Sequence, residues 1–136
     1  MVQAAPFILV LLLALGAHAF PSQQCNLAGF WKNDLGSNMT IFDLNKKGNF
    51  FGNYSTAVST NSSNIKVSPL LGSQHKGPNQ KGQPTFGFTV HWSFSDSITV
   101  FTGQCFVDDN GKEVLKTMWL LRSHMDECSD DWKATR

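Results

Sequence analysis

Residues 84–101 read PTFGFTVHWSFSDSITVF, and this stretch decides the expected fold. From Phe86 to Phe94, large apolar side chains alternate with small or polar ones without a break. A period of two that is rich in aromatic and β-branched residues is typical of a half-buried antiparallel strand. One face of this strand therefore carries Phe86, Phe88, Val90, Trp92 and Phe94, and the other carries Gly87, Thr89, His91 and Ser93.

A second strand is expected directly afterwards, from Ser97 to Phe106. A two-residue turn at positions 95 and 96 predicts three cross-strand pairs, namely Phe94 with Ser97, Trp92 with Thr99, and Val90 with Phe101.

One face of this hairpin thus combines large aromatic rings with hydroxyl groups. A buried hydroxyl without a partner costs about 1–3 kcal/mol, so an ordinary core gains nothing from one. Aromatic walls with a few placed polar groups are typical of a small-molecule pocket. The alternative is a core whose hydroxyls bond to the backbone, and the hairpin alone leaves both interpretations open.

The chain begins with an apolar run, Phe7 to Ala17, that is too short to span a membrane, followed by Ala17-His18-Ala19. Small residues in that spacing are typical of a signal-peptide cleavage site. We therefore expect residues 1–19 to be a signal peptide, residues 20–136 to form one domain, and the protein to be secreted. In an exported chain the sequons at Asn38, Asn53 and Asn61 predict N-glycosylation.

Charge and cysteine content narrow the class of function. The formal net charge of the 136 residues is +1, which argues against nucleic acid as a partner. After the leader, no apolar run is long enough to suggest a membrane partner. The three cysteines, Cys25, Cys105 and Cys128, are most simply one disulfide and one odd thiol. No spacing typical of a metal site occurs.

Short strand-like segments follow one another with turn signals between them. Beside the hairpin, we expect strands at about 27–32, 38–44, 49–57, 65–73 and 113–123. Pro69 predicts an edge or a bulge in the fourth of these, because proline cannot donate to a sheet ladder. The order predicts an antiparallel meander, either an up-and-down barrel or a sandwich.

Several segments resemble one family, the avidins. They are CNLAGFWKNDLGSNMT (25–40), QPTFGFTV (83–90), VFTGQCF (100–106), KTMWLLRS (116–123) and DDWKATR (130–136). The resemblance covers nearly the whole chain after residue 20. It implies an all-β, eight-stranded up-and-down barrel that forms a homotetramer and binds biotin at one end of each barrel.

The resemblance also implies roles for individual residues. Asn33, Ser37 and Tyr54 match the residues around the ureido oxygen of biotin, Thr56 a partner of a ureido nitrogen, and Thr99 the hydroxyl near the sulfur. Trp92, Phe94, Phe101 and Trp119 match an aromatic box, and Leu121 is included in the same ligand-binding set. Ser95, Ser97 and the segment Ser59, Thr60 and Asn61 match the carboxylate end, and Trp132 matches a tryptophan lent to a neighbouring subunit.

Each role has an alternative that needs no ligand. Asn33 and Ser37 flank a turn and can stabilise it, while Trp92 and Trp119 can be plain core. The single tyrosine, Tyr54, can be a core residue bonded to backbone.

The resemblance implies a Cys25–Cys105 disulfide, which leaves Cys128 unpaired. In the family an eighth strand follows the point reached at Arg136, and it supplies an asparagine for the second ureido nitrogen. The fold expected for this chain therefore lacks that final strand and has an open seam.

The favoured function is a secreted, non-enzymatic protein that sequesters biotin and needs no cofactor. One alternative is an avidin-like barrel that has lost high-affinity binding through C-terminal truncation. Another is a carrier of a different small ligand, as in lipocalins. No catalytic triad or carboxylate pair argues for an enzyme.

Overall fold

The structure is a computed structural model that describes residues 24–56 and 67–136. They form one seven-stranded sheet in which every strand pairs antiparallel with its neighbours in chain order. The predicted up-and-down meander is therefore confirmed. The strands are β1 (Gly29–Lys32), β2 (Asn38–Ile41), β3 (Asn49–Ser55), β4 (Val67–Gln74), β5 (Thr85–His91), β6 (Ile98–Val107) and β7 (Glu113–Arg122), with short 3-10 helices η1 (Pro78–Gln80) and η2 (Cys128–Lys133).

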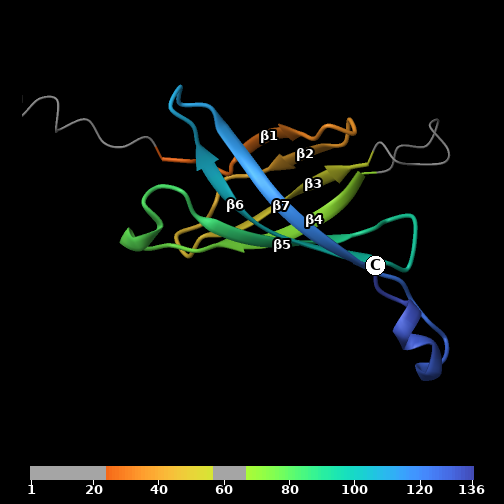
Figure 1. Cartoon of the computed structure of the whole chain (residues 1–136). Coiled ribbons are helices and arrows are strands. Elements are labelled where there is room, and N and C mark those ends of the chain that lie inside the picture. The colour runs from red at the N-terminus through yellow and green to blue at the C-terminus, as the bar shows by residue number, and fades with distance from the viewer. Residues whose placement is uncertain (1–23, 57–66) are drawn as a thin grey trace, which may run out of the picture.

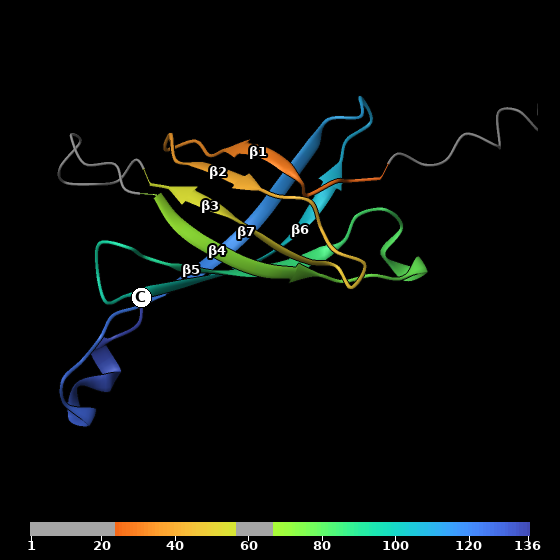
Figure 2. The ribbon, with the colours of Figure 1, turned by 180° about the vertical axis from the view of Figure 1, so that it is seen from behind.

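The sheet is strongly curled into a half-barrel. Figures 1 and 2 show β7 crossing opposite β1–β4, so one face of the sheet is concave and the other convex. The β2–β3, β4–β5 and β6–β7 connections lie at one end, and the β1–β2 and β5–β6 connections lie at the other end with η2. We call these the packed end and the open end.

The free edge of β7 carries the beginning of a further pairing. The Leu121 backbone N–H donates to the Arg136 carbonyl at 2.7 Å, and the Arg136 N–H donates back at 3.0 Å. Ser123 N–H donates to the Ala134 carbonyl at 2.8 Å. Residues 134–136 therefore add to the sheet antiparallel to β7, beyond what the sequence predicted. Along Glu113–Leu120, no described strand pairs on that side.

The packed end is filled by aromatic side chains from the concave face, as the alternation predicted. Phe50, Phe86 and Phe88 are at most 5% exposed. The rings of Phe86 and Phe88 stack with centroids 6.1 Å apart, and Phe88 meets Phe50 edge-on at 6.4 Å. Gly72 on β4 makes this fit possible, since a Cβ there would lie 2.5 Å from the Phe88 Cβ and 2.7 Å from the Phe50 ring.

Pro69 lies in a strand with neighbours on both sides, which differs from the expected edge or bulge. It pairs with Asn53 of β3, while the pairing of β4 with β5 begins only at Leu70. In β4 the N–H and C=O groups of odd-numbered residues point toward β5, as the bond from His75 N–H to the Thr85 carbonyl shows. The N–H that Pro69 lacks would therefore point where no ladder has yet formed.

The register of the central hairpin was predicted wrongly by two residues. The structure pairs Val90 with Thr99 and His91 with Ile98, so residues 92–97 form a longer loop. The cause is a contact from outside the hairpin. Ser68 of β4 accepts the Ser93 backbone N–H at 3.0 Å, and the Ser93 hydroxyl donates to the Val67 carbonyl at 3.1 Å. The chain therefore bends toward β4 after His91, and because the slip is an even number, each side chain keeps its predicted face.

The disulfide between Cys25 and Cys105 is present, with the two Cα atoms 6.0 Å apart. Cys25 N–H also donates to the Gly82 carbonyl at 2.8 Å, and Asn26 N–H to the Glu113 carboxylate at 3.1 Å. These contacts fix the segment before β1 across the packed end. Cys128 is free and exposed.

In the described parts of the chain, none of the helices has the length and apolar character needed to cross a bilayer.

Candidate ligand site at the open end

An aromatic cluster lies on the concave face at the open end. Tyr54 comes from the end of β3, Trp92 directly follows β5, and Phe101 belongs to β6. The Tyr54 ring meets Trp92 edge-on with centroids 5.6 Å apart, and it lies 5.6 Å from the Phe101 ring. Trp92 in turn contacts Phe94 at 5.6 Å. Four residues predicted to form a site therefore do come together.

These rings differ from those at the packed end in their exposure. Tyr54, Trp92 and Phe101 are partly buried, and Phe94 is 48% exposed. Trp119 pairs with Phe101 and Leu121 pairs with Thr99 across β6–β7, which brings both to the same concave face. Trp119 is 57% exposed because it lies next to the free edge of β7. The cluster is thus an aromatic wall open on one side.

Two hydroxyl groups form a polar point beside this wall. Ser37, directly before β2, is only 5% exposed and hydrogen-bonds to the Tyr54 hydroxyl. Burial raises the pKa of the Tyr54 phenol above its usual value, and the bond with Ser37 lowers that pKa by a smaller amount. Tyr54 is therefore protonated at neutral pH and remains a hydrogen-bond donor.

A second polar point lies at Thr99, which is 2% exposed. The Trp92 indole Nε1–H donates to the Thr99 Oγ1 at 2.7 Å. This contact joins the loop after β5 to Thr99, the second residue of β6. Trp92 is therefore both a wall and a hydrogen-bond donor.

Asn33 has the turn-stabilising contacts that sequence reasoning left open. Its Oδ1 accepts the backbone N–H groups of Leu35 at 3.0 Å and Ser37 at 2.8 Å. These bonds hold Ser37 in place, so the turn positions one member of the polar point. An asparagine side chain also has an NH₂ group, and that group is what Asn33 has left to offer a ligand.

The β5–β6 loop carries further hydroxyls that the sequence singled out. The Ser95 and Ser97 hydroxyls hydrogen-bond to each other at the exposed rim of the open end. Ser68 and Ser93, which were not predicted as site residues, hold this loop against β4. A signal was present in the sequence, because the strand period places Ser68 on the concave face beside Leu70.

Some predicted residues are not part of the cluster. Trp132 lies in η2, which projects from the sheet in Figures 1 and 2, and it is 81% exposed. Thr56 directly follows β3 and is partly buried. Ser59, Thr60 and Asn61 lie outside the described residues.

One group of potential metal ligands occurs within residues 24–56 and 67–136, namely Cys25, Cys105 and Glu113. Both sulfur atoms are joined in the disulfide, and the Glu113 carboxylate accepts the Asn26 N–H. A disulfide has no thiolate to bind a metal, so this group is structural.

Comparison with known proteins decides the family. Residues 21–136 match the model of the Avidin family. The chain belongs to the avidin family. It is 59% identical to Avidin from Gallus gallus over 134 residues, which cover 97% of this chain and 88% of that protein. It is 60% identical to Avidin-related protein 4/5 from Gallus gallus, with 97% of this chain and 87% of that protein covered.

Solved structures agree with this assignment. The crystal structure of Xenavidin matches with a TM-score of 0.75 and 54% identity, covering 84% of this chain and 92% of that one. The structure of a biotin binding protein from chicken matches with a TM-score of 0.76 and 55% identity, covering 85% and 92%. The all-β fold of this chain is therefore that of the avidins.

Avidin-family membership also settles the class of activity. Members of the family bind a ligand without catalysing a reaction and without a cofactor, so this chain is not an enzyme. The aromatic and hydroxyl groups at the open end therefore need no nucleophile or general base. These groups can bind a ligand through ring contacts and hydrogen bonds.

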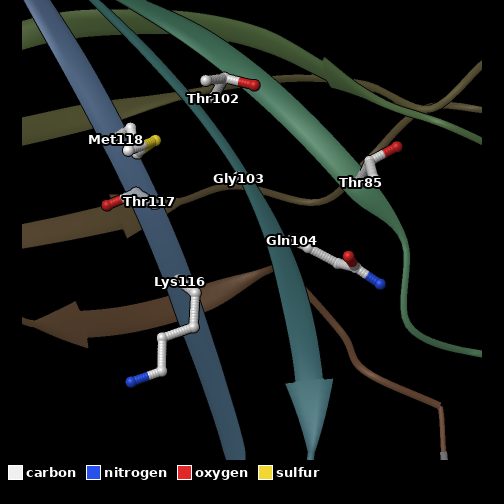
Figure 3. Close-up of a pocket in the computed structure, with 7 residues that line it drawn as sticks. All are labelled: Thr85, Thr102, Gly103, Gln104, Lys116, Thr117 and Met118. Atoms are coloured by element: carbon white, nitrogen blue, oxygen red, sulfur yellow. The ribbon is translucent and has the colours of Figure 1, made fainter.

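The hollows of the convex face are separate from this site. One of about 370 Å³ is lined from β5, β6 and β7 by Thr85, Thr102, Gly103, Gln104, Lys116, Thr117 and Met118 (Figure 3). A second, of about 400 Å³, continues over β4 and shares Thr85 and Thr102 with the first. Both are shallow, and most of their side chains point away from the face that carries Tyr54 and Trp92.

Proposed function

We propose that the chain is a secreted protein that binds and sequesters biotin in the pocket at the open end of the half-barrel. The observation that carries the proposal is the juxtaposition of the Ser37–Tyr54 and Trp92–Thr99 hydrogen-bonded pairs within one aromatic cluster. A lipid carrier would need the rings but not two buried polar points. A second ligand class is not favoured by any contact in the cluster.

Biotin matches this arrangement group by group. Its flat bicyclic ring system suits the walls made by Trp92, Phe101 and Trp119. Its ureido oxygen is a strongly polarised acceptor, which suits the donor groups that Asn33, Ser37 and Tyr54 offer. Hydrogen bonds made in a low-dielectric pocket are stronger than the same bonds in water. Thr56, Leu121 and Phe94 complete the proposed lining.

The carboxylate end of the ligand would lie at the rim. Ser95 and Ser97 offer hydroxyl donors there, and we assign the segment of Ser59, Thr60 and Asn61 to the same subsite. Hydroxyls at an exposed rim can hold a carboxylate that stays in contact with water.

The proposal includes export and glycosylation. We assign residues 1–19 to a cleaved signal peptide, residues 20–136 to the binding domain, and sugars to Asn38, Asn53 and Asn61. Asn53 faces the convex side of β3, where it is exposed. Expression in a secreting eukaryotic cell, followed by intact mass with and without glycosidase, tests both assignments. A chain that keeps residue 1 or shows no sugar contradicts them.

We also infer that the domain assembles as a homotetramer through the convex faces of β4–β7. A row of cross-strand neighbours on this face runs through Leu71, Thr89, Val100 and Leu120. Its three apolar members, Leu71, Val100 and Leu120, are 53%, 44% and 57% exposed. Met118, 77% exposed, lies beside it. An exposed apolar patch of this kind is typical of a protein interface. In such an assembly Trp132 would enter a neighbouring pocket.

Isothermal titration of the purified chain with biotin tests the central proposal. We expect saturable binding with one site per chain, lost in Trp92→Ala. Light scattering on the same sample gives the oligomeric state, and Leu120→Asp should shift it toward monomer, while Lys47→Asp in the exposed β2–β3 turn should not. Absence of saturable binding by the unsubstituted chain refutes the biotin assignment.

A further inference from the structure

The contact between Trp92 and Thr99 has a fixed direction. An indole Nε1–H can only donate a hydrogen bond, whereas a threonine hydroxyl can both donate and accept. In the 2.7 Å contact the Thr99 oxygen is therefore the acceptor. This assignment follows from the chemistry of the two groups and does not depend on seeing hydrogen atoms.

The direction of that bond leaves one defined group for a ligand. With its oxygen accepting from Trp92, the Thr99 hydroxyl still has its own proton to donate. Among the described residues no acceptor takes that proton, although the residue is only 2% exposed. A buried donor without an acceptor is unfavourable unless a ligand or a water molecule completes it. The Thr99 subsite is therefore a donor that lacks its acceptor.

We propose that Trp92 is a specificity-determining residue that makes Thr99 act as a donor toward the ligand. The subsite then selects a ligand with an acceptor atom at this position and discriminates against one that presents no heteroatom there. This inference rests on the proposed biotin function. With the ureido oxygen at Ser37 and Tyr54, the heteroatom on the opposite side of the bicycle is the thioether sulfur.

The structure explains why an indole serves here better than a phenyl ring. A phenylalanine at position 92 can keep ring contacts with Tyr54 and Phe94, but it has no N–H. The freed Thr99 hydroxyl can then rotate, and its proton can turn to a backbone carbonyl instead of the ligand. The aromatic ring at position 92 would be retained, but the Thr99 hydroxyl would no longer be held in one orientation.

The test compares biotin with desthiobiotin, which has the ureido group and acid chain but no sulfur. The readout is the ratio of the two dissociation constants, measured by competitive titration. Because one neutral hydrogen bond is worth about tenfold in affinity, we expect Trp92→Phe and Thr99→Val each to lower this ratio by about five- to tenfold. The double variant should lower it no further, because both changes remove the same interaction.

Two control variants separate this role from general damage to the pocket. Trp119→Phe makes the same chemical change in a tryptophan that does not bond Thr99, so it should weaken both ligands and leave the ratio unchanged. Thr99→Ser keeps the hydroxyl and should keep the ratio. If Trp92→Phe weakens both ligands equally, as Trp119→Phe does, the proposed role of Trp92 is wrong.

A ligand-free measurement distinguishes failure of this inference from failure of the biotin assignment. In ¹H–¹⁵N spectra of the unsubstituted chain, the Trp92 indole N–H should be protected from solvent exchange, and Thr99→Val should shift it and speed its exchange. Protection that does not depend on Thr99 overturns the inference. If that protection holds but neither ligand binds, the biotin assignment fails and the specificity claim for biotin fails with it.

Discussion

The two ends of the half-barrel are built from the same strands but are filled differently. At the packed end, Phe50, Phe86 and Phe88 contact one another and are at most 5% exposed, and the Cys25–Cys105 disulfide closes the end. At the open end, Tyr54, Trp92 and Trp119 remain partly exposed, and buried hydroxyls lie between them. At both ends, inward-facing and outward-facing side chains alternate along each strand.

The difference shows which residues separate a core from a pocket on one sheet face. A dry aromatic core gains free energy from burial alone, whereas an exposed aromatic wall with unsatisfied donors is costly until something binds. The packed end therefore accounts for stability and the open end for recognition. Phe88 joins them, because its ring stacks on Phe101 at 4.6 Å.

Phe50→Ala should destabilise the fold more than any other single substitution considered. Phe50 is 0% exposed, and removing a buried phenyl ring typically costs about 3–5 kcal/mol. Urea denaturation monitored by fluorescence measures the change. The matched control is Phe51→Ala on the convex face, where the ring is 61% exposed and the expected change is below about 0.5 kcal/mol. Equal effects at the two positions would contradict the assignment of the concave face as buried and the convex face as exposed.

The disulfide should come next. It links residues 80 positions apart, for which the chain-entropy model gives roughly 4 kcal/mol, with about 2–4 kcal/mol usual in practice. The double variant Cys25→Ser with Cys105→Ser should lose about that much unfolding free energy. Because the bond is at the packed end, the folded fraction should keep its biotin affinity within about threefold. Cys128→Ser, at the exposed free thiol, is the control and should change neither quantity.

The extent to which the sequence predicted these two ends depends on the range of the interactions involved. The period-two pattern from Phe86 to Phe94 was enough to assign each side chain to a face, because that assignment is local. The pairing register was missed because it depends on Ser68, 25 residues away from Ser93, and no local turn signal contains that contact. The added pairing of Arg136 with Leu121 was missed for the same reason.

The candidate site divides in the same way. Family resemblance indicated the candidate ligand-binding residues, and the alternation of β3 predicted that Tyr54 faces inward. A turn-stabilising role for Asn33 was one of the alternatives, and its bonds to Leu35 and Ser37 match it. Neither resemblance nor alternation predicted that the indole of Trp92 would bond Thr99. Such contacts depend on side-chain rotamers that only the packed structure defines.

At the open end, removing the Ser37–Tyr54 pair should affect recognition more than stability. Tyr54→Phe combined with Ser37→Ala removes two of the three proposed donors to the ureido oxygen but keeps the ring. Each lost hydrogen bond in a buried site costs about 1–3 kcal/mol, so biotin affinity should fall by at least about tenfold. Titration calorimetry measures it, with Thr102→Ala on the convex face as the control. A loss of unfolding free energy as large as that of Phe50→Ala would show that the pair belongs to the core.

The smallest effect expected is a dependence of stability on alkaline pH that arises from Tyr54. Its pKa is raised in the folded chain by burial, so above about pH 10 the unfolded chain loses the phenolic proton before the folded chain does. The unfolded state then binds fewer protons, and the free energy of unfolding falls as pH rises. This contribution is fully present below the unfolded pKa and is lost as pH rises through the folded pKa. The measurement is the difference in denaturation midpoint between the unsubstituted chain and Tyr54→Phe from pH 8 to 11, because this difference removes the contributions that the two chains share. That difference should change only above about pH 10. A constant difference across the range would mean that the Tyr54 phenol titrates as it does in water, and that its end of the barrel is wetter than its contacts with Ser37 and Trp92 imply.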